Sequence, residues 1–174
     1  MGAEVQWDPA TYTVRITSRT TEDASRPSAT LLEATVTRIV DGDTVEVSLS
    51  GVKEKVRFTG VDCPEAGTDA GTAVTEYTRK ALDGKKVYLE TDVGLRDKYG
   101  RLLAYVWLSE PKQVAEQAIR SQMFNARLLL VDMAQLMTVP PNVKYVDYST
   151  AFQREAREAK VGLWADDRDI QEPA

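Results

Sequence analysis

Alternation of apolar and polar residues is the strongest pattern in the first two thirds of the chain. It is clearest at 44–47 (Thr-Val-Glu-Val) and at 56–59 (Val-Arg-Phe-Thr), and such alternation is typical of strands with one buried face. Ser50-Gly51 lies between these stretches and predicts a hairpin turn. The whole pattern predicts five core strands, at 31–39, 43–49, 53–61, 86–91 and 101–108.

The first of these strands should bury Leu32, Ala34 and Val36 on one face, with Arg38 next at the same spacing. Alternation around 12–16 predicts one further short strand, outside the core set.

Helical spacing of apolar residues begins after the third core strand. Thr68 or Asp69 is expected to cap a helix that runs to about residue 82, where Gly84 should end it. The apolar residues between 114 and 133 predict one long helix or two broken ones.

A loop and a final helix follow. Pro140-Pro141 predict a loop over 138–148. Thr150 and Gln153 form a capping box, which predicts that the last helix begins at Thr150 and turns Ala159 inward.

This order of elements fits a mainly β, α+β fold: a five-stranded Greek-key barrel of the OB type with about three helices. We expect an N-terminal extension and linker over 1–30, the barrel domain over 31–165 and a tail over 166–174.

Composition narrows the chemistry. The chain has 174 residues, no histidine and one cysteine, which excludes Ser-His and Cys-His triads, His-ligated zinc and an intramolecular disulfide. A net charge of -5 argues against a broad non-specific nucleic-acid surface, but it allows phosphate contacts inside a cleft. No apolar run is long enough to span a bilayer and no signal peptide is visible, so no membrane span is expected.

Four charged residues fall in or beside the predicted hairpin. Asp43 opens its first strand, and Arg57, Asp62 and Glu65 lie in its second strand or just after it. The hairpin would bring Asp43 near Asp62, so that carboxylates distant in sequence meet at one mouth of the sheet. Such oxygen donors suit a hard cation.

Each of these residues also has a purely structural interpretation. The Asp-Gly-Asp sequence around Asp43 could be an Asx turn. Arg57 could form a surface ion pair of little energetic value, and Asp62 could merely end a strand. Arg101 could be the polar start of the fifth core strand.

Four motifs in order resemble the staphylococcal nuclease (thermonuclease) family. They are VDGDTV at 40–45, VRFTGVDCPE at 56–65, DKYGR at 97–101 and AREAKVGLW at 156–164. The resemblance covers residues 31–165 and implies an OB-fold barrel with calcium-dependent phosphodiesterase activity on DNA and RNA. It also implies hydrolysis of the 5′ P–O bond, which leaves 3′-phosphate ends.

The resemblance implies that Asp43 and Asp62 bind Ca²⁺ directly, with the main-chain carbonyl of Cys63 as a third ligand. The Cys63 side chain stands where the family often has threonine, and we expect the thiol to be a small apolar filler.

The resemblance also assigns the residues of catalysis. Glu65 matches the general base that holds the attacking water, and Arg57 and Arg101 match the phosphate contacts. Lys98 and Tyr99 match substrate-binding positions at the phosphate end of the nucleotide. The expected substrates are single-stranded or locally melted DNA and RNA. Calcium dependence favours a secreted or cell-envelope protein.

Besides Cys63, the chain departs from the family at two places. Thr138 and Pro140 are aligned with tyrosines that pack against the nucleotide, and Tyr145 or Tyr148 could either replace these or serve as loop packing. The stretch 111–122 looks inserted, and it could cover the barrel or contact a partner.

Two lysine pairs remain unassigned. Lys53 with Lys55, and Lys85 with Lys86, could follow a nucleic-acid backbone or could be solvated strand ends.

Three hypotheses follow for the function. The first is a calcium-dependent nuclease, the second a non-catalytic domain of the same fold that binds nucleic acid or a protein, and the third a module that calcium only stabilises. The second predicts loss of some of the charged motif residues, and this chain keeps all of them.

Overall fold

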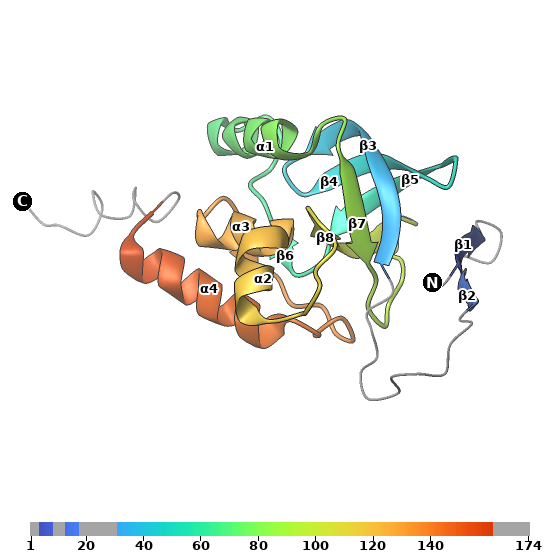
Figure 1. Cartoon of the computed structure of the whole chain (residues 1–174). Helices are drawn as coiled ribbons and strands as arrows, with labels where there is room; N and C mark the ends of the chain where they lie inside the picture. The colour runs from blue at the N-terminus through green and yellow to red at the C-terminus, as the bar shows by residue number, and fades with distance from the viewer. Residues whose placement is uncertain (1–3, 9–12, 18–30, 162–174) are drawn as a thin grey trace, which may run out of the picture.

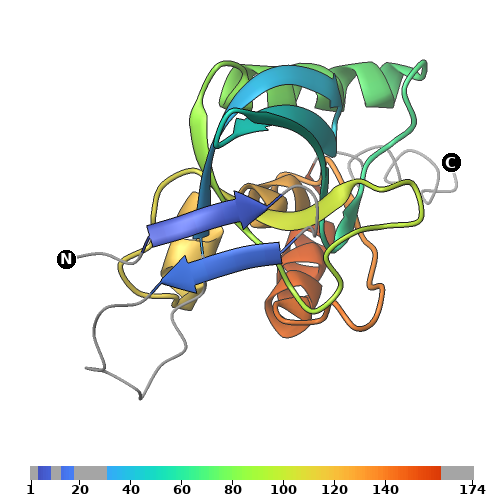
Figure 2. The same ribbon diagram turned by 90° about the vertical axis from the view of Figure 1, so that its right-hand side faces the viewer.

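The computed structural model describes residues 4–8, 13–17 and 31–161. A closed five-stranded barrel in the order β3-β4-β5-β8-β7 forms its centre (Figures 1 and 2). Every neighbouring pair is antiparallel except β5 and β8, which run parallel. The predicted OB-type α+β fold is therefore confirmed. The strands are β1 Glu4–Asp8, β2 Thr13–Thr17, β3 Leu31–Asp41, β4 Thr44–Leu49, β5 Val52–Phe58, β6 Val61–Asp62, β7 Lys86–Glu90, β8 Leu102–Trp107 and β9 Gln135–Leu136.

Four helices accompany the barrel in the described part of the chain, one more than expected. Three of them, α2, α3 and α4, group together on one side of the barrel. The fourth, α1, lies along the upper edge of the barrel in Figure 1. None of these helices is long and apolar enough to cross a membrane. The helices are α1 Asp69–Leu82, α2 Glu116–Gln122, α3 Phe124–Leu130 and α4 Val146–Ala159.

One continuous core joins the barrel interior to the helices. Phe58 of β5 meets Phe124 of α3 edge to face, with ring centroids 5.8 Å apart. Tyr77 of α1 stacks on the same Phe124 ring at 5.9 Å. Such aromatic pairs add to the free energy gained from area burial alone. This core fixes the position of β5, which contributes the central arginine of the site described below.

The hairpin and the first helix agree with the sequence interpretation. Ser50 and Gly51 form the β4–β5 turn with φ angles of 51° and 80°. Thr68 is the N-cap of α1, where its hydroxyl accepts a hydrogen bond from Gly71 N at 2.9 Å. The helical stretch after residue 114 is broken in two, because Met123 between α2 and α3 adopts an extended conformation.

Two local predictions were wrong. Arg38 is exposed and Ile39 is buried, because the pairing of β3 with β4 shifts register between Val36 and Arg38. The last helix begins at Val146 rather than at Thr150, and Thr150 donates to the Val146 carbonyl inside it. No capping box forms.

Side-chain contacts of α4 explain why Thr150 and Gln153 do not form the predicted capping box. The Gln153 side chain accepts a hydrogen bond from Leu136 N in β9 at 2.6 Å, so it satisfies another segment rather than its own helix start. Phe152 and Ala156 are buried, but Ala159 is exposed.

The apparent insertion at 111–122 packs onto the protein. Ile119 of α2 is 1% exposed and belongs to the core. Gln122 accepts a main-chain hydrogen bond from Leu108, at the end of β8, at 2.7 Å. The segment therefore extends the core beside the barrel.

Residues 1–3, 9–12, 18–30 and 162–174 lie outside the described residues, so the predicted linker and tail stay predictions. The short strand expected around 12–16 is β2, and it pairs with β1 in an antiparallel hairpin.

Candidate active site

Arg57 holds two carboxylates together at the mouth of the β4–β5 hairpin. The strand register pairs Arg57 with Thr44, which places Asp43 beside the guanidinium. Nη2 of Arg57 lies 3.4 Å from Asp43 Oδ2 and 3.2 Å from Asp62 Oδ1. The structure thus brings Asp43, Arg57 and Asp62 into one cluster.

The Arg57 side chain is locked in place. It is buried, and its Nη1 donates to the carbonyls of Phe58 at 2.9 Å and Val61 at 2.7 Å. A planar guanidinium makes several directed hydrogen bonds at once, so its orientation is fixed before any ligand arrives. The alternative of a weak surface ion pair is therefore wrong.

Asp43 is a buried carboxylate with incomplete charge compensation. Its Oδ2 accepts a hydrogen bond from Cys63 N at 2.8 Å, and its Oδ1 accepts one from the Thr44 hydroxyl at 3.2 Å. Burial raises the pKa of Asp43 to about 6, against the lowering effects of the Arg57 charge and the Cys63 N–H. The Asx turn also exists, since Asp43 N donates to Asp41 Oδ1 at 3.1 Å. The two interpretations are compatible.

Asp43→Asn should change how stability depends on pH in calcium-free protein. The folded-state pKa of Asp43, about 6, lies above its ordinary value of 3.8, so the unfolded state binds fewer protons between these pH values. The unfolding free energy of the wild type should therefore fall as pH rises from 4 to 6. We expect D43N to gain roughly 2 kcal/mol on the wild type over that interval.

Urea unfolding with chelator present, at pH 4, 5, 6 and 7, measures this difference. Taking the difference between the two proteins removes the other titrating groups, which both share. A difference that stays constant with pH would show that Asp43 is not an uncompensated buried carboxylate.

Cys63 contributes its main chain to the site and its side chain to the core. The thiol is buried, and burial raises its pKa well above the ordinary range. A Cβ at Gly42 would lie 3.2 Å from Cys63 Sγ and 2.4 Å from Val74 Cγ1, so only glycine fits there. Close packing of Gly42 against Cys63 therefore sets the approach of the Asp43 turn to β6.

Glu65 lies on an exposed turn between β6 and α1. Its main-chain carbonyl accepts a hydrogen bond from the Thr68 hydroxyl at 2.8 Å. A Cβ at Gly71 would lie 1.9 Å from the same carbonyl oxygen, so the turn can pack on α1 only because residue 71 is glycine. The Glu65 turn and the first turn of α1 are therefore held together by main-chain contacts. The Glu65 carboxylate is exposed to solvent.

The 97–101 loop presents Arg101 through a local ion pair. Arg101 Nε donates to Asp97 Oδ2 at 2.7 Å, and Arg101 N donates to Asp97 Oδ1 at 3.0 Å. Partial burial would raise the pKa of Asp97, but these bonds and the guanidinium charge outweigh it and hold the pKa below its ordinary value. The centroid of the Tyr99 ring lies 5.3 Å from Arg101 Cζ and 5.1 Å from Lys98 Nζ, within cation–π distance of both.

A cleft of about 190 Å³ brings the predicted basic and aromatic residues together. Arg57 and Arg101 line it, as do Lys98 and Tyr99. The other four predicted residues, Asp43, Asp62, Cys63 and Glu65, are not among its lining residues. The remaining lining residues are Phe58, Thr59, Gly60, Asp97, Leu103, Met137, Val139 and Asn142.

In the segment 137–140, the residues that line the cleft are not those that the sequence analysis aligned with the nucleotide-packing tyrosines. Met137 and Val139 line the cleft, whereas Thr138 and Pro140 do not. Met137 is 39% exposed and Val139 is 54% exposed, so this wall is apolar and accessible. Neighbouring residues in an extended segment point to opposite sides. An alignment shifted by one residue therefore selects Thr138 and Pro140 in place of Met137 and Val139.

Sequence reasoning missed the contacts that hold the two cleft walls together. Asn142 and Gly94 exchange two hydrogen bonds, of 2.6 Å and 2.8 Å. Asp92 Oδ2 accepts hydrogen bonds from Tyr105 OH at 2.9 Å and from Lys144 N at 3.1 Å. Asparagine next to Pro-Pro was the available signal, but its partner is 48 residues away.

Of the two candidate replacement tyrosines, Tyr145 is buried in the protein interior and Tyr148 is exposed on α4. Tyr145 is 3% exposed, and its hydroxyl donates to the buried carboxylate of Glu90 at 2.9 Å. Burial, followed by the Glu90 charge, raises the pKa of Tyr145 above its ordinary value. Tyr148 lies on α4 beside Phe152, with ring centroids 6.3 Å apart. Neither tyrosine lines the cleft.

The Asp43 and Asp62 carboxylates fit a hard cation. One guanidinium nitrogen bridges both of them, so two carboxylates share a single compensating charge and the cluster can accept further positive charge. No group of three or more His, Cys, Asp or Glu side chains suited to a metal occurs in the described part of the chain. Two carboxylates and a carbonyl would leave most coordination positions to water and substrate.

Comparison with known proteins agrees with this geometry. Residues 55–166 match the family model described as "Staphylococcal nuclease homologue". The chain is 37% identical to a thermonuclease of Staphylococcus intermedius over 135 residues, 74% of this chain and 74% of the relative. It is 34% identical to a thermonuclease of Staphylococcus hyicus, with 75% and 74% covered, and 33% identical to the endonuclease YncB of Bacillus subtilis, with 81% and 65% covered.

The barrel and its charged mouth define an OB-fold protein with a cleft that Arg57, Lys98 and Arg101 line. The chain belongs to the staphylococcal nuclease family.

Proposed function

We propose that this protein is a calcium-dependent nuclease that hydrolyses phosphodiester bonds of DNA and RNA. The observation that supports this most is the Arg57 guanidinium, which is locked between Asp43 and Asp62 and also lines a cleft shared with Arg101. The thermonucleases and the endonuclease to which the chain is similar support the same reaction class. Cleavage of the 5′ P–O bond, leaving 3′-phosphate ends, is part of the proposal.

Asp43, Asp62 and the Cys63 carbonyl would hold the calcium ion. A bound Ca²⁺ would supply positive charge to a phosphate oxygen and to a water molecule. The Cys63 N–H and the Thr44 hydroxyl orient the Asp43 carboxylate, and Arg57 orients Asp62. Such supporting bonds keep carboxylate ligands in position.

Arg57 and Arg101 would stabilise charge on the phosphate. The carbonyls of Phe58 and Val61 fix Arg57, so little reorganisation is needed when the phosphate becomes more negative. Arg101 donates a hydrogen bond to Asp97 through Nε. Within the described residues, no hydrogen bond involves Nη1 or Nη2 of Arg101. Those nitrogens are available to two oxygens of one phosphate.

Glu65 would act as general base toward the attacking water, and its solvent-facing carboxylate is accessible for proton transfer. Lys98 and the 71%-exposed Tyr99 would contact the nucleotide at its phosphate end. The apolar Met137–Val139 wall would face the nucleotide from the other side.

Cleavage of quenched single-stranded DNA and RNA reporters tests this proposal. We expect cleavage with Ca²⁺ that stops when a chelator is added in excess. Glu65→Gln, purified in parallel, controls for contaminating nucleases. Calcium-independent cleavage, or equal rates in the wild type and this variant, would contradict the proposal.

A further inference from the structure

A line of three basic residues leads along β5 into the cleft. Side chains alternate along a strand, and Val56 and Phe58 point into the core. Lys53, Lys55 and Arg57 therefore share the opposite, outer face, with successive residues about 7 Å apart along the strand. Lys53 and Lys55 are exposed, whereas Arg57 is covered by the chain that follows it.

Parallel pairing of β5 with β8 puts Lys55 next to the second phosphate-binding arginine. Val56 pairs with Leu102, and Arg57 pairs with Leu103. Arg101 directly precedes β8, so we infer from this register, continued by one residue, that Lys55 comes beside Arg101. Lys55 thus adjoins both arginines of the cleft, one along its own strand and one across the sheet.

The acidic neighbour of these lysines is already compensated. Glu46 of β4 pairs in register with Lys55 and with Arg38 of β3. Its Oε1 lies 3.3 Å from Arg38 Nη1, and its Oε2 lies 3.8 Å from Lys53 Nζ. Within the described residues, Lys55 has no carboxylate within ion-pair distance. On a chain of net charge -5, this strip of the outer face is locally basic.

We propose that Lys55 and Lys53 form a backbone track, in which they bind the phosphates of a polynucleotide next to the one being cleaved. A single strand that leaves the cleft along the outer face of β5 meets Lys55 first and Lys53 next. Flexible, exposed ammonium groups suit phosphates in variable geometry and read no base sequence. The track rests on the proposed nuclease function, and it predicts that long strands are better substrates than short ones.

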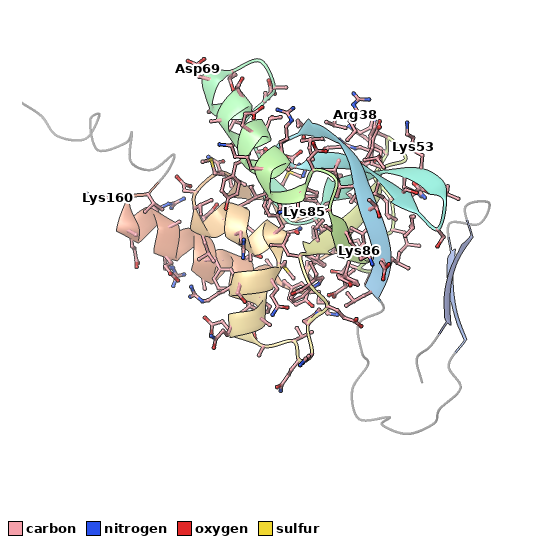
Figure 3. The ribbon with its side chains drawn as sticks, turned by 45° about the horizontal axis from the view of Figure 1, so that its top comes forward. Arg38, Lys53, Asp69, Lys85, Lys86 and Lys160 are labelled. Atoms are coloured by element: carbon pink, nitrogen blue, oxygen red, sulfur yellow. The ribbon has the colours of Figure 1, made fainter. Side chains whose placement is uncertain are left out.

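Lys85 and Lys86 provide the matched control. They are exposed and carry the same two charges, but they lie at the start of β7, which does not pair with β5: in the closed barrel β8 stands between the two strands on one side, and β3 and β4 on the other (Figure 3). Lys86 pairs with Glu33 at 3.2 Å. These lysines are not placed in the cleft or the track.

The test compares the wild type, K53Q/K55Q and K85Q/K86Q on a dinucleotide and on a 30-residue single strand of DNA, at several salt concentrations. For K53Q/K55Q we expect KM for the long strand to rise about tenfold, and the loss in kcat/KM on the long strand to exceed that on the dinucleotide at least fivefold. The slope of log affinity against log salt should become shallower by about 1 to 2. K85Q/K86Q should match the wild type in all of these measurements.

Equal losses on both substrates, an unchanged salt slope in K53Q/K55Q, or an equal effect in K85Q/K86Q would overturn the track. Fluorescence anisotropy of the labelled long strand, measured with each protein, separates this result from failure of the proposed function. If the wild type binds but does not cleave, the same salt slopes still decide whether the track exists.

Discussion

Arg57→Lys should reduce the rate of phosphodiester cleavage by about 10³-fold, the largest single effect that we expect. The substitution keeps a positive charge but loses the fork that joins the carbonyls of Phe58 and Val61 to Asp43 and Asp62. Buried carbonyls would lose their donors, so the unfolding free energy should also fall by roughly 2 kcal/mol. Steady-state cleavage at a temperature where circular dichroism shows folded protein measures the first effect, and urea unfolding measures the second.

Arg38→Lys is the matched control for this variant. Arg38 is exposed and its contact with Glu46 is a surface ion pair, so we expect a change of less than about 0.5 kcal/mol and no large loss of rate. If Arg57→Lys kept a rate within fivefold of the wild type, the locked guanidinium would have no part in phosphate stabilisation.

Glu65→Gln should lower turnover by about 10² to 10⁴-fold and leave stability nearly unchanged. The amide cannot take a proton from water, so general base catalysis is lost. The carboxylate is exposed, and the turn is held by the main-chain carbonyl of Glu65 rather than by its side chain. A large loss of rate without a shift in melting temperature is therefore the expected signature.

Glu76→Gln makes the same chemical change on α1, where Glu76 pairs with Arg79 at the surface. We expect its turnover to stay within twofold of the wild type. A drop of less than tenfold in Glu65→Gln would remove Glu65 from the proton transfer and would leave the base unidentified.

The regular part of the fold was predictable because it rests on local periodicity. Apolar patterning located all five barrel strands, although the one expected over 53–61 ends at Phe58 and Val61 belongs to β6. Ser50-Gly51 located the hairpin that brings Asp43 to Arg57. The bulge between Val36 and Arg38 was missed, although the sequence marks it: Thr37 and Arg38 are both polar and Ile39 is apolar, so the alternation slips by one residue there.

The charged motif positions were also readable, but their physical state was not. No sequence pattern says that Arg57 is buried or that Asp43 has a raised pKa, since both depend on coverage by β6 and the chain around it. The cleft walls depend on contacts such as Asn142 with Gly94, which join segments far apart in the chain. Such long-range contacts decided that Met137 and Val139 face the cleft.

The calcium concentration that gives half-maximal cleavage, compared between the wild type and Asp62→Asn, tests the central claim most directly. The Asp62 side chain is 58% exposed, so its removal should alter the site without unfolding the protein. Asp69→Asn, at the exposed start of α1, is the control with the same charge change. We predict at least a tenfold higher half-activating concentration for Asp62→Asn and no shift for Asp69→Asn. An unchanged concentration in Asp62→Asn would contradict the claim that the carboxylates bridged by Arg57 hold the activating calcium ion.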